Sequence, residues 1–101
     1  MAKKLKPIPP GEILFEEFMK PLGISQNKLG RDIDVPVGRI NEIIHGKRVL
    51  TSDTALRLAA YFRTTPEFWI NLQSRYDLKI TKEKKGALIL RTVRPIHALA
   101  T

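Results

Sequence analysis

Residues 25–48 hold two short amphipathic stretches separated by a tight turn. Ser25 precedes the first stretch, and its hydroxyl can accept a hydrogen bond from an unpaired backbone N–H of the first helical turn. Leu29 and Ile33 follow four residues apart, so they share one face of a helix. The next two residues suit a short turn, and Pro36 suits the first turn of a second helix because its missing N–H would have no partner there.

The second stretch carries its own apolar stripe and its own stop. Ile40, Ile43 and Ile44 form the stripe, and Gly46 is placed for a left-handed residue just beyond the helix. The side chains left to face outward are Val37, Gly38, Arg39, Asn41, Glu42 and His45. Two short helices joined in this way form a helix-turn-helix, which presents its second helix to the major groove of DNA. The segment therefore predicts a DNA-binding regulator rather than an enzyme.

Composition limits the chemistry that such a chain can perform. Its 101 residues suit one domain, and the lack of cysteine excludes disulfides and thiolate metal sites and favours a reducing compartment. His45 and His97 lie far apart without ligand spacing, so we expect no metal and no cofactor. No apolar run reaches the length of a membrane span and no signal-peptide pattern opens the chain, so we expect a cytoplasmic protein with no membrane partner.

The net charge of +8 is confined to the two ends of the chain. Residues 1–10 carry three lysines and no acid, and residues 79–101 carry six basic side chains against Glu83. Residues 11–78 hold nine basic and nine acidic side chains. Basic tails attract phosphates without distinguishing their sequence, and they also keep a small protein soluble. Charge alone leaves both interpretations open.

Helix-start signals recur outside the helix-turn-helix segment. Pro10 opens a first helix, with apolar residues at core spacing as far as Leu22. Thr51 begins a fourth helix, and Thr65 begins a fifth, where a cap, a first-turn proline and an early carboxylate follow in sequence. Trp69 lies in an aromatic stripe of that helix, and we assign it to the core rather than to a cofactor site. These signals predict an all-α, five-helix repressor-like domain.

The two ends are predicted to differ from this domain, which we place at residues 10–80. Residues 1–9 contain three lysines and two prolines and are expected to form a flexible basic segment. Residues 81–101 form a basic C-terminal tail, which begins with a charged turn. Within it, residues 87–93 are rich in aliphatic and β-branched side chains and favour a β-strand.

A single strand needs a partner for its backbone groups. The simplest partner is the same strand of a second copy, paired antiparallel across a two-fold axis, which would make the protein a homodimer. The alternatives are that residues 87–93 extend the fifth helix or remain disordered. The predicted dimer contacts are Leu88, Ile89, Leu90, Thr92 and Val93.

Five short motifs stand in order along the chain: PGEIL at residues 10–14, RINEI at 39–43, GKR at 46–48, DTALRL at 53–58 and PEFWINLQ at 66–73. Together they resemble the HigA antitoxins, small repressor-like proteins of the Xre helix-turn-helix class, over roughly residues 8–80. The resemblance implies a homodimer that binds a palindromic operator in the promoter of its own operon. It also implies a protein partner, a HigB-type toxin similar to the RelE-like mRNA endonucleases.

The second helix of the motif is predicted to contact bases. Arg39 is the first candidate because a guanidinium pairs with O6 and N7 of guanine, although a phosphate or Glu42 is an alternative partner. Asn41 and Glu42 match the edges of adenine and cytosine, and either can instead support the fold. By register with the repressor-like class, Val37 and Gly38 begin the exposed face, where Val37 can contact a thymine methyl. Many relatives carry a longer polar or basic residue in place of Gly38.

A second set of residues is predicted to contact phosphates. Gln26 opens a helix whose side-chain amide and backbone N–H groups can bind a phosphate, as the resemblance also implies, and Asn27 is assigned beside it. Lys47 and Arg48 follow the second helix and are assigned the same role, the alternative being a solvated loop. His45 either joins them or complements the helix dipole.

The sequence therefore favours an antitoxin of a type II toxin–antitoxin system. Such a protein neutralises a HigB/RelE-like mRNA endonuclease and represses its own operon by binding DNA at a specific sequence. One alternative is a stand-alone Xre-family repressor without a toxin, and another is an interaction module whose helix-turn-helix no longer binds DNA. No nucleophile motif, histidine–acid pair or phosphate-binding glycine loop indicates an enzyme.

Overall fold

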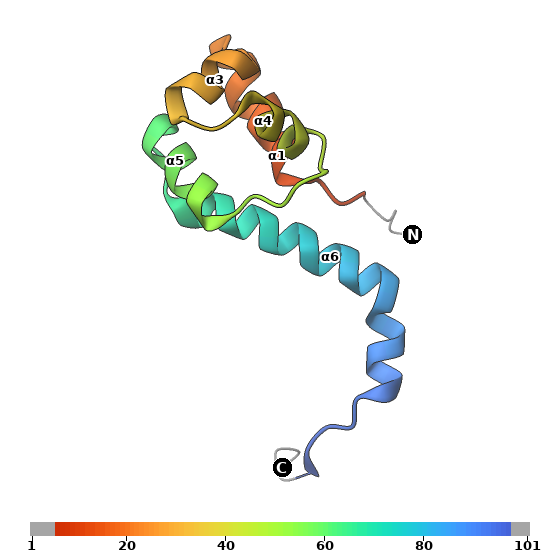
Figure 1. Cartoon of the computed structure of the whole chain (residues 1–101). Coiled ribbons are helices and arrows are strands. Elements are labelled where there is room, and N and C mark those ends of the chain that lie inside the picture. The colour runs from red at the N-terminus through yellow and green to blue at the C-terminus, as the bar shows by residue number, and fades with distance from the viewer. Residues whose placement is uncertain (1–5, 98–101) are drawn as a thin grey trace.

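The structure, a computed structural model, describes residues 6–97 and contains helices but no strand in that range (Figure 1). The first helix is continuous and consists of α1 (Pro10–Ile13), a π-helical stretch η1 (Leu14–Met19) and α2 (Lys20–Leu22). It is followed by α3 (Gln26–Ile33), α4 (Val37–Ile44), α5 (Ser52–Phe62) and α6 (Pro66–Thr92). The predicted all-α fold with five helices is therefore confirmed.

Local capping signals place most of the helix ends. The Ser25 hydroxyl accepts a hydrogen bond from the backbone N–H three residues on at 3.0 Å, and the Thr51 and Thr65 hydroxyls do the same at 3.4 and 3.1 Å. Gly46 has φ +72° and lies just beyond α4, as predicted. Pro36 differs by one position, since it precedes the first residue of α4 rather than lying within the helix.

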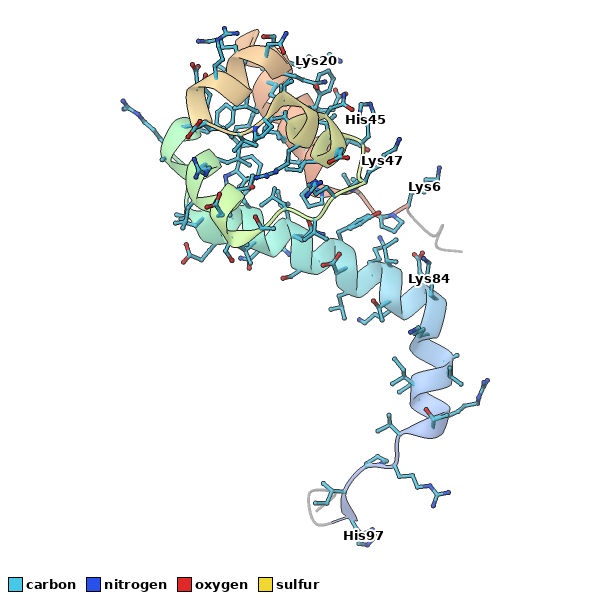
Figure 2. The ribbon with its side chains drawn as sticks, in the orientation of Figure 1. Lys6, Lys20, His45, Lys47, Lys84 and His97 are labelled. Atoms are coloured by element: carbon cyan, nitrogen blue, oxygen red, sulfur yellow. The ribbon has the colours of Figure 1, made fainter. Side chains whose placement is uncertain are left out.

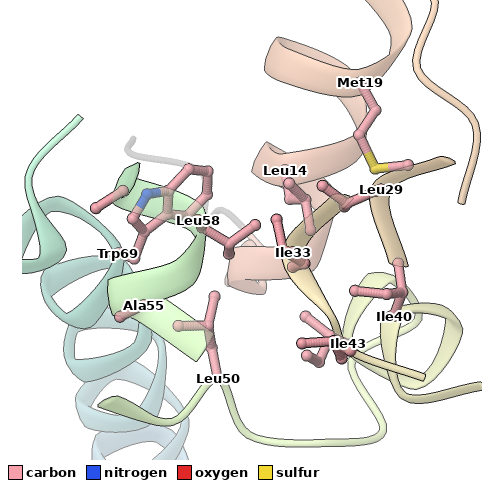
Figure 3. Packing of buried hydrophobic residues seen from close by; sticks show 12 residues of the cluster. Leu14, Met19, Leu29, Ile33, Ile40, Ile43, Leu50, Ala55, Leu58 and Trp69 are labelled. Carbon is pink, nitrogen blue, oxygen red and sulfur yellow. The ribbon is translucent and has the colours of Figure 1, made fainter. Parts of the chain in front are cut away.

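All five helices contribute to one hydrophobic core (Figure 3). Each supplies a fully buried side chain, in chain order Leu14, Leu29, Ile40, Leu58 and Trp69. The Trp69 indole N–H donates to the Thr64 hydroxyl at 2.8 Å, so its one polar atom is satisfied. The assignment of Trp69 to the core is confirmed.

Leu22 does not lie in the core, contrary to its predicted spacing. Its side chain is 63% exposed, whereas Leu14 is fully buried. The π-helical stretch Leu14–Met19 lies between them, and its i→i+5 hydrogen bonding interrupts the 3.6-residue period on which the prediction depended.

The predicted β-strand over residues 87–93 is wrong, and so is the predicted turn before it. Both segments belong to α6, which ends at Thr92. The backbone groups that a lone strand would leave unpaired are bonded within the helix, where the Val93 N–H donates to the Ile89 carbonyl at 2.9 Å. The residues predicted to pair across a dimer therefore lie on or just after the last turns of a helix: Leu88, Ile89, Leu90, Thr92 and Val93.

α6 extends well beyond the domain on which its first half packs (Figure 1). Its buried residues are Trp69 and Gln73, and from residue 81 onward nearly every residue is exposed. The radius of gyration is 17.3 Å, against about 13 Å for a compact chain of 100 residues. Within residues 6–97, no helix combines the length and the apolar character needed to cross a membrane.

The start of the first helix lies directly against the end of α4. A Cβ atom added to Gly11 would lie 1.8 Å from the Ile43 carbonyl oxygen and 2.6 Å from the Ile44 Cα. Only a residue without a side chain fits there, because both atoms belong to backbone that cannot move independently. Gly11 thus lets α1 and α4 approach backbone to backbone.

We predict that Gly11→Ala lowers the free energy of unfolding by about 3 kcal/mol, the upper end of the usual range for overpacking, because the added methyl meets backbone. Urea denaturation followed by circular dichroism measures the change. Gly38→Ala is the matched control, since a Cβ there meets nothing within 4 Å and alanine favours the helix by about 1 kcal/mol. Equal free energies of unfolding for Gly11→Ala and Gly38→Ala would contradict the close contact of Gly11 with the backbone of α4.

Candidate nucleic-acid interface

α4 turns one side into the core and the other to solvent. Ile40 and Ile43 are buried, whereas Val37 is 44% exposed. Arg39 is also exposed, and within residues 6–97 its side chain makes no hydrogen bond or ion pair. The five predicted base-contact residues all lie on this helix, four of them exposed and the fifth half-buried: Val37, Gly38, Arg39, Asn41 and Glu42. The helix therefore offers a continuous polar face with a free guanidinium.

Asn41 and Gln26 lie together although fifteen residues separate them in the chain. The Asn41 side-chain amide donates to Gln26 Oε1 at 3.2 Å, so the middle of α4 is joined to the first residue of α3. The Ser25 cap fixes that end of α3, and Asn27 is exposed beside it. A residue predicted to contact bases and a residue predicted to contact a phosphate thus share one surface.

Glu42 is paired with Arg48 and not with Arg39, the partner that the sequence had offered as an alternative. Arg48 Nε donates to the Glu42 carboxylate at 2.7 Å. The Lys47 backbone N–H also donates to the Glu42 carbonyl, at 2.8 Å. These bonds hold the Arg48 guanidinium and the Lys47 backbone against the last turn of α4, and the Arg39 side chain stays unpaired.

His45 ends α4. Its ring Nδ1–H donates to the Asn41 carbonyl at 2.8 Å in the tautomer that this contact requires. The same carbonyl also accepts a hydrogen bond from the His45 backbone N–H at 3.1 Å, so the ring adds a second bond at the end of the helix. This matches the interpretation that His45 supports the helix terminus. The side chain is exposed.

Arg57 was not identified from the sequence, although it positions the turn between α3 and α4. Its Nη1 donates to the Ile33 carbonyl at 2.9 Å, and its Nε donates to the Asp53 carboxylate at 2.7 Å. The same guanidinium holds the pKa of Asp53 below its ordinary value, first by the hydrogen bond and then by its charge. Asp34 begins the turn in the left-handed conformation, with φ +59°.

Gln73 is the second residue that sequence analysis missed. Its Oε1 accepts a hydrogen bond from the Leu50 backbone N–H at 2.8 Å, and its Nε2 donates to the Asp77 carboxylate at 2.9 Å. Both Gln73 and Leu50 are buried, so α6 holds the loop that follows α4. A glutamine inside an apolar stripe was the one available signal, but nothing local indicates a partner 23 residues away.

A polar cluster joins α3 to α5. The Tyr61 hydroxyl donates to the Asp32 carboxylate at 2.6 Å, and Lys28 Nζ donates to the same oxygen at 2.9 Å. Both donors lower the pKa of Asp32, the tyrosine hydrogen bond most strongly, and the pKa of Tyr61 is raised in turn. The outer side of α3 is therefore tied to α5, so both helices that carry the polar surface are anchored to the rest of the domain.

Comparison with known proteins agrees with this geometry. A family model described as helix-turn-helix matches residues 15–69, which include α3, the turn and α4. The chain is therefore a helix-turn-helix protein of the DNA-binding regulator class and not an enzyme.

Relatives narrow the class to one family. An addiction module antidote protein of the HigA family from Coxiella burnetii is 47% identical with a TM-score of 0.86, covering 91% of this chain and 100% of that one. The Pseudomonas aeruginosa antitoxin HigA, solved with the higBA promoter, is 38% identical with a TM-score of 0.86, covering 90% and 99%. Virulence-associated protein I of Dichelobacter nodosus is 46% identical over 81 residues, covering 80% and 75%. The chain belongs to the HigA family of antitoxins.

Proposed function

We propose that this protein represses its own operon by binding a palindromic operator, and that it neutralises a HigB-type toxin, an mRNA endonuclease of the RelE-like class. The observation that carries the proposal is the free polar face of α4, with Arg39 unpaired at its centre. The support from relatives is a HigA antitoxin of known structure that was solved with its promoter. The core uses the opposite side of the helix, and the Arg39 guanidinium makes no hydrogen bond or ion pair within residues 6–97.

Arg39 is the principal base contact in this proposal. Its guanidinium has no partner to lose, so pairing with O6 and N7 of a guanine breaks no hydrogen bond of the protein. Val37 and Gly38 come at the N-terminal end of the helix and let it approach the base edges closely. Asn41 and Glu42 remain predicted base contacts, and each would exchange its present partner for a base.

Phosphate contacts hold the helix in the groove. Gln26 and Asn27 lie at the N-terminus of α3, where unpaired backbone N–H groups favour an anion. Lys47 and Arg48 follow α4, and His45, exposed at the end of that helix, is the third predicted phosphate contact there. These contacts carry no sequence information, but they fix the register of α4 on the duplex.

A palindromic operator requires two copies of the chain related by a two-fold axis. We propose that the outer turns of α6 make the homodimer contact, as a helix rather than as a strand. Their apolar side chains are exposed, Leu90 at 83%, and a solvent-exposed apolar surface on a projecting helix favours association. The proposed contacts are those predicted from the sequence: Leu88, Ile89, Leu90, Thr92 and Val93.

We predict that Arg39→Ala weakens binding to the promoter DNA upstream of the protein's own gene by about 5- to 150-fold, the loss expected for one bidentate guanine contact. Fluorescence anisotropy with a labelled duplex measures the affinity. Arg63→Asn is the matched control, because Arg63 is an exposed cation at the end of α5 with φ +60°, a conformation that asparagine tolerates. Undiminished operator binding by Arg39→Ala would favour an interaction module that does not bind DNA.

We also predict that the small gene beside this one encodes a toxin. Its expression alone should arrest growth, and co-expression of this chain should restore growth and yield a stable complex on co-purification. Arg39→Ala should restore growth equally well, since α4 is not assigned to the toxin. Operator binding without toxicity or a complex would identify the protein as a stand-alone repressor.

A further inference from the structure

Four exposed cations line two adjoining depressions beside the first half of α6. Arg75 and Lys79 line both depressions, Lys6 lines one and Lys82 lines the other. On α6 these positions follow the spacing i, i+4, i+7, which places them on one face of the helix. Lys6 joins them because the segment before the first helix lies along α6, where Ile8 lines the same depression as Arg75. We call Lys6, Arg75, Lys79 and Lys82 the basic track.

The basic track carries charge that the protein itself does not compensate. No aspartate or glutamate is among the residues that line either depression. Within residues 6–97, the ion pairs and side-chain hydrogen bonds involve none of the four cations. Gathering like charges without a counter-ion is unfavourable by itself, and an anionic partner along the track would remove that cost.

The basic track continues from the end of the recognition helix. A third depression is lined by Lys47 and Arg48, which follow α4, and it shares Tyr76 with the depression that Lys6 lines. Figure 2 shows Lys47 and Lys6 on the same side of the molecule. Asp77 also lines this third depression, and its carboxylate accepts a hydrogen bond from Gln73 Nε2 at 2.9 Å. The cations that follow α4 and the basic track therefore line neighbouring depressions.

We propose that the basic track binds the sugar–phosphate backbone of the DNA that flanks the operator. The inference rests on the proposed function, since it takes α4 to be in the major groove of the operator. Flexible lysines and an arginine at helical spacing, with no acceptor side chain among them, suit a repeating anion and do not distinguish one base from another. Flanking DNA of any sequence would then add affinity through the track, while the operator sequence is recognised by α4.

The test compares two duplexes that contain the promoter segment protected by the protein. One duplex is that segment alone, and the other is extended at both ends by about ten base pairs, roughly one helical turn, of arbitrary sequence. We expect the extension to tighten binding of the unaltered protein about tenfold at low salt. The triple variant Arg75→Gln, Lys79→Gln, Lys82→Gln should lose this gain, and its salt dependence on the extended duplex should fall by about one per removed cation in each bound protomer.

The triple variant Arg63→Asn, Lys84→Gln, Lys85→Gln is the matched control. It removes the same charge from exposed positions outside the proposed dimer contacts, and none of the three lines either depression. It should keep the gain from the flanks. Two results would contradict the proposed role of the basic track while leaving operator binding intact. One is that the flanking DNA does not tighten binding of the unaltered protein, and the other is that both triple variants lose this gain in affinity equally. Failure of the unaltered protein to bind the minimal operator would instead contradict the proposed function, and the proposed role of the basic track would fall as well.

Discussion

The close approach of Gly11 to the Ile43 carbonyl is the contact on which the position of α4 depends. It brings the first helix against the C-terminal end of α4 with no side chain between the two backbones. Ile40 and Ile43 then fill the core from the same helix, so both the depth and the rotation of α4 are set. The polar face that we assign to DNA is what remains on the outside once these two conditions are met.

Two buried or half-buried polar residues complete this frame from elements distant in the sequence. Arg57 on α5 holds the end of α3 through the Ile33 carbonyl, and Gln73 on α6 holds the loop after α4 through the Leu50 N–H. Each bond satisfies a backbone group that neither helix nor strand would otherwise pair. The recognition helix is thereby fixed at both of its ends, which is the preorganisation that base-specific contacts require. The outer half of α6, by contrast, packs against nothing in the domain and is free to meet other molecules.

Features that depend on residues close together in the chain could be predicted from the sequence, and features that depend on distant residues could not. The caps at Ser25 and Thr65 and the stop at Gly46 were predicted correctly because each depends on a few neighbouring residues. The strand predicted over residues 87–93 was wrong. Its β-branched and aliphatic side chains favour a strand locally, but α6 continues through this segment and pairs its backbone N–H and C=O groups within the helix. Arg57 and Gln73 were missed because their partners lie 24 and 23 residues away. Two pairs of candidate residues lie together, Asn41 with Gln26 and Glu42 with Arg48, and the contacts of all the candidates with DNA stay predictions.

Entry of α4 into the major groove can be tested by measuring whether the bound protein protects guanine N7 from methylation by dimethyl sulfate. N7 faces the major groove and lies beside the O6 that Arg39 would bind. We expect protected guanines in two half-sites whose centres are about 10 base pairs apart, on one face of the promoter DNA. Unprotected guanine N7 in a bound promoter, or protection confined to adenine N3 in the minor groove, would contradict it.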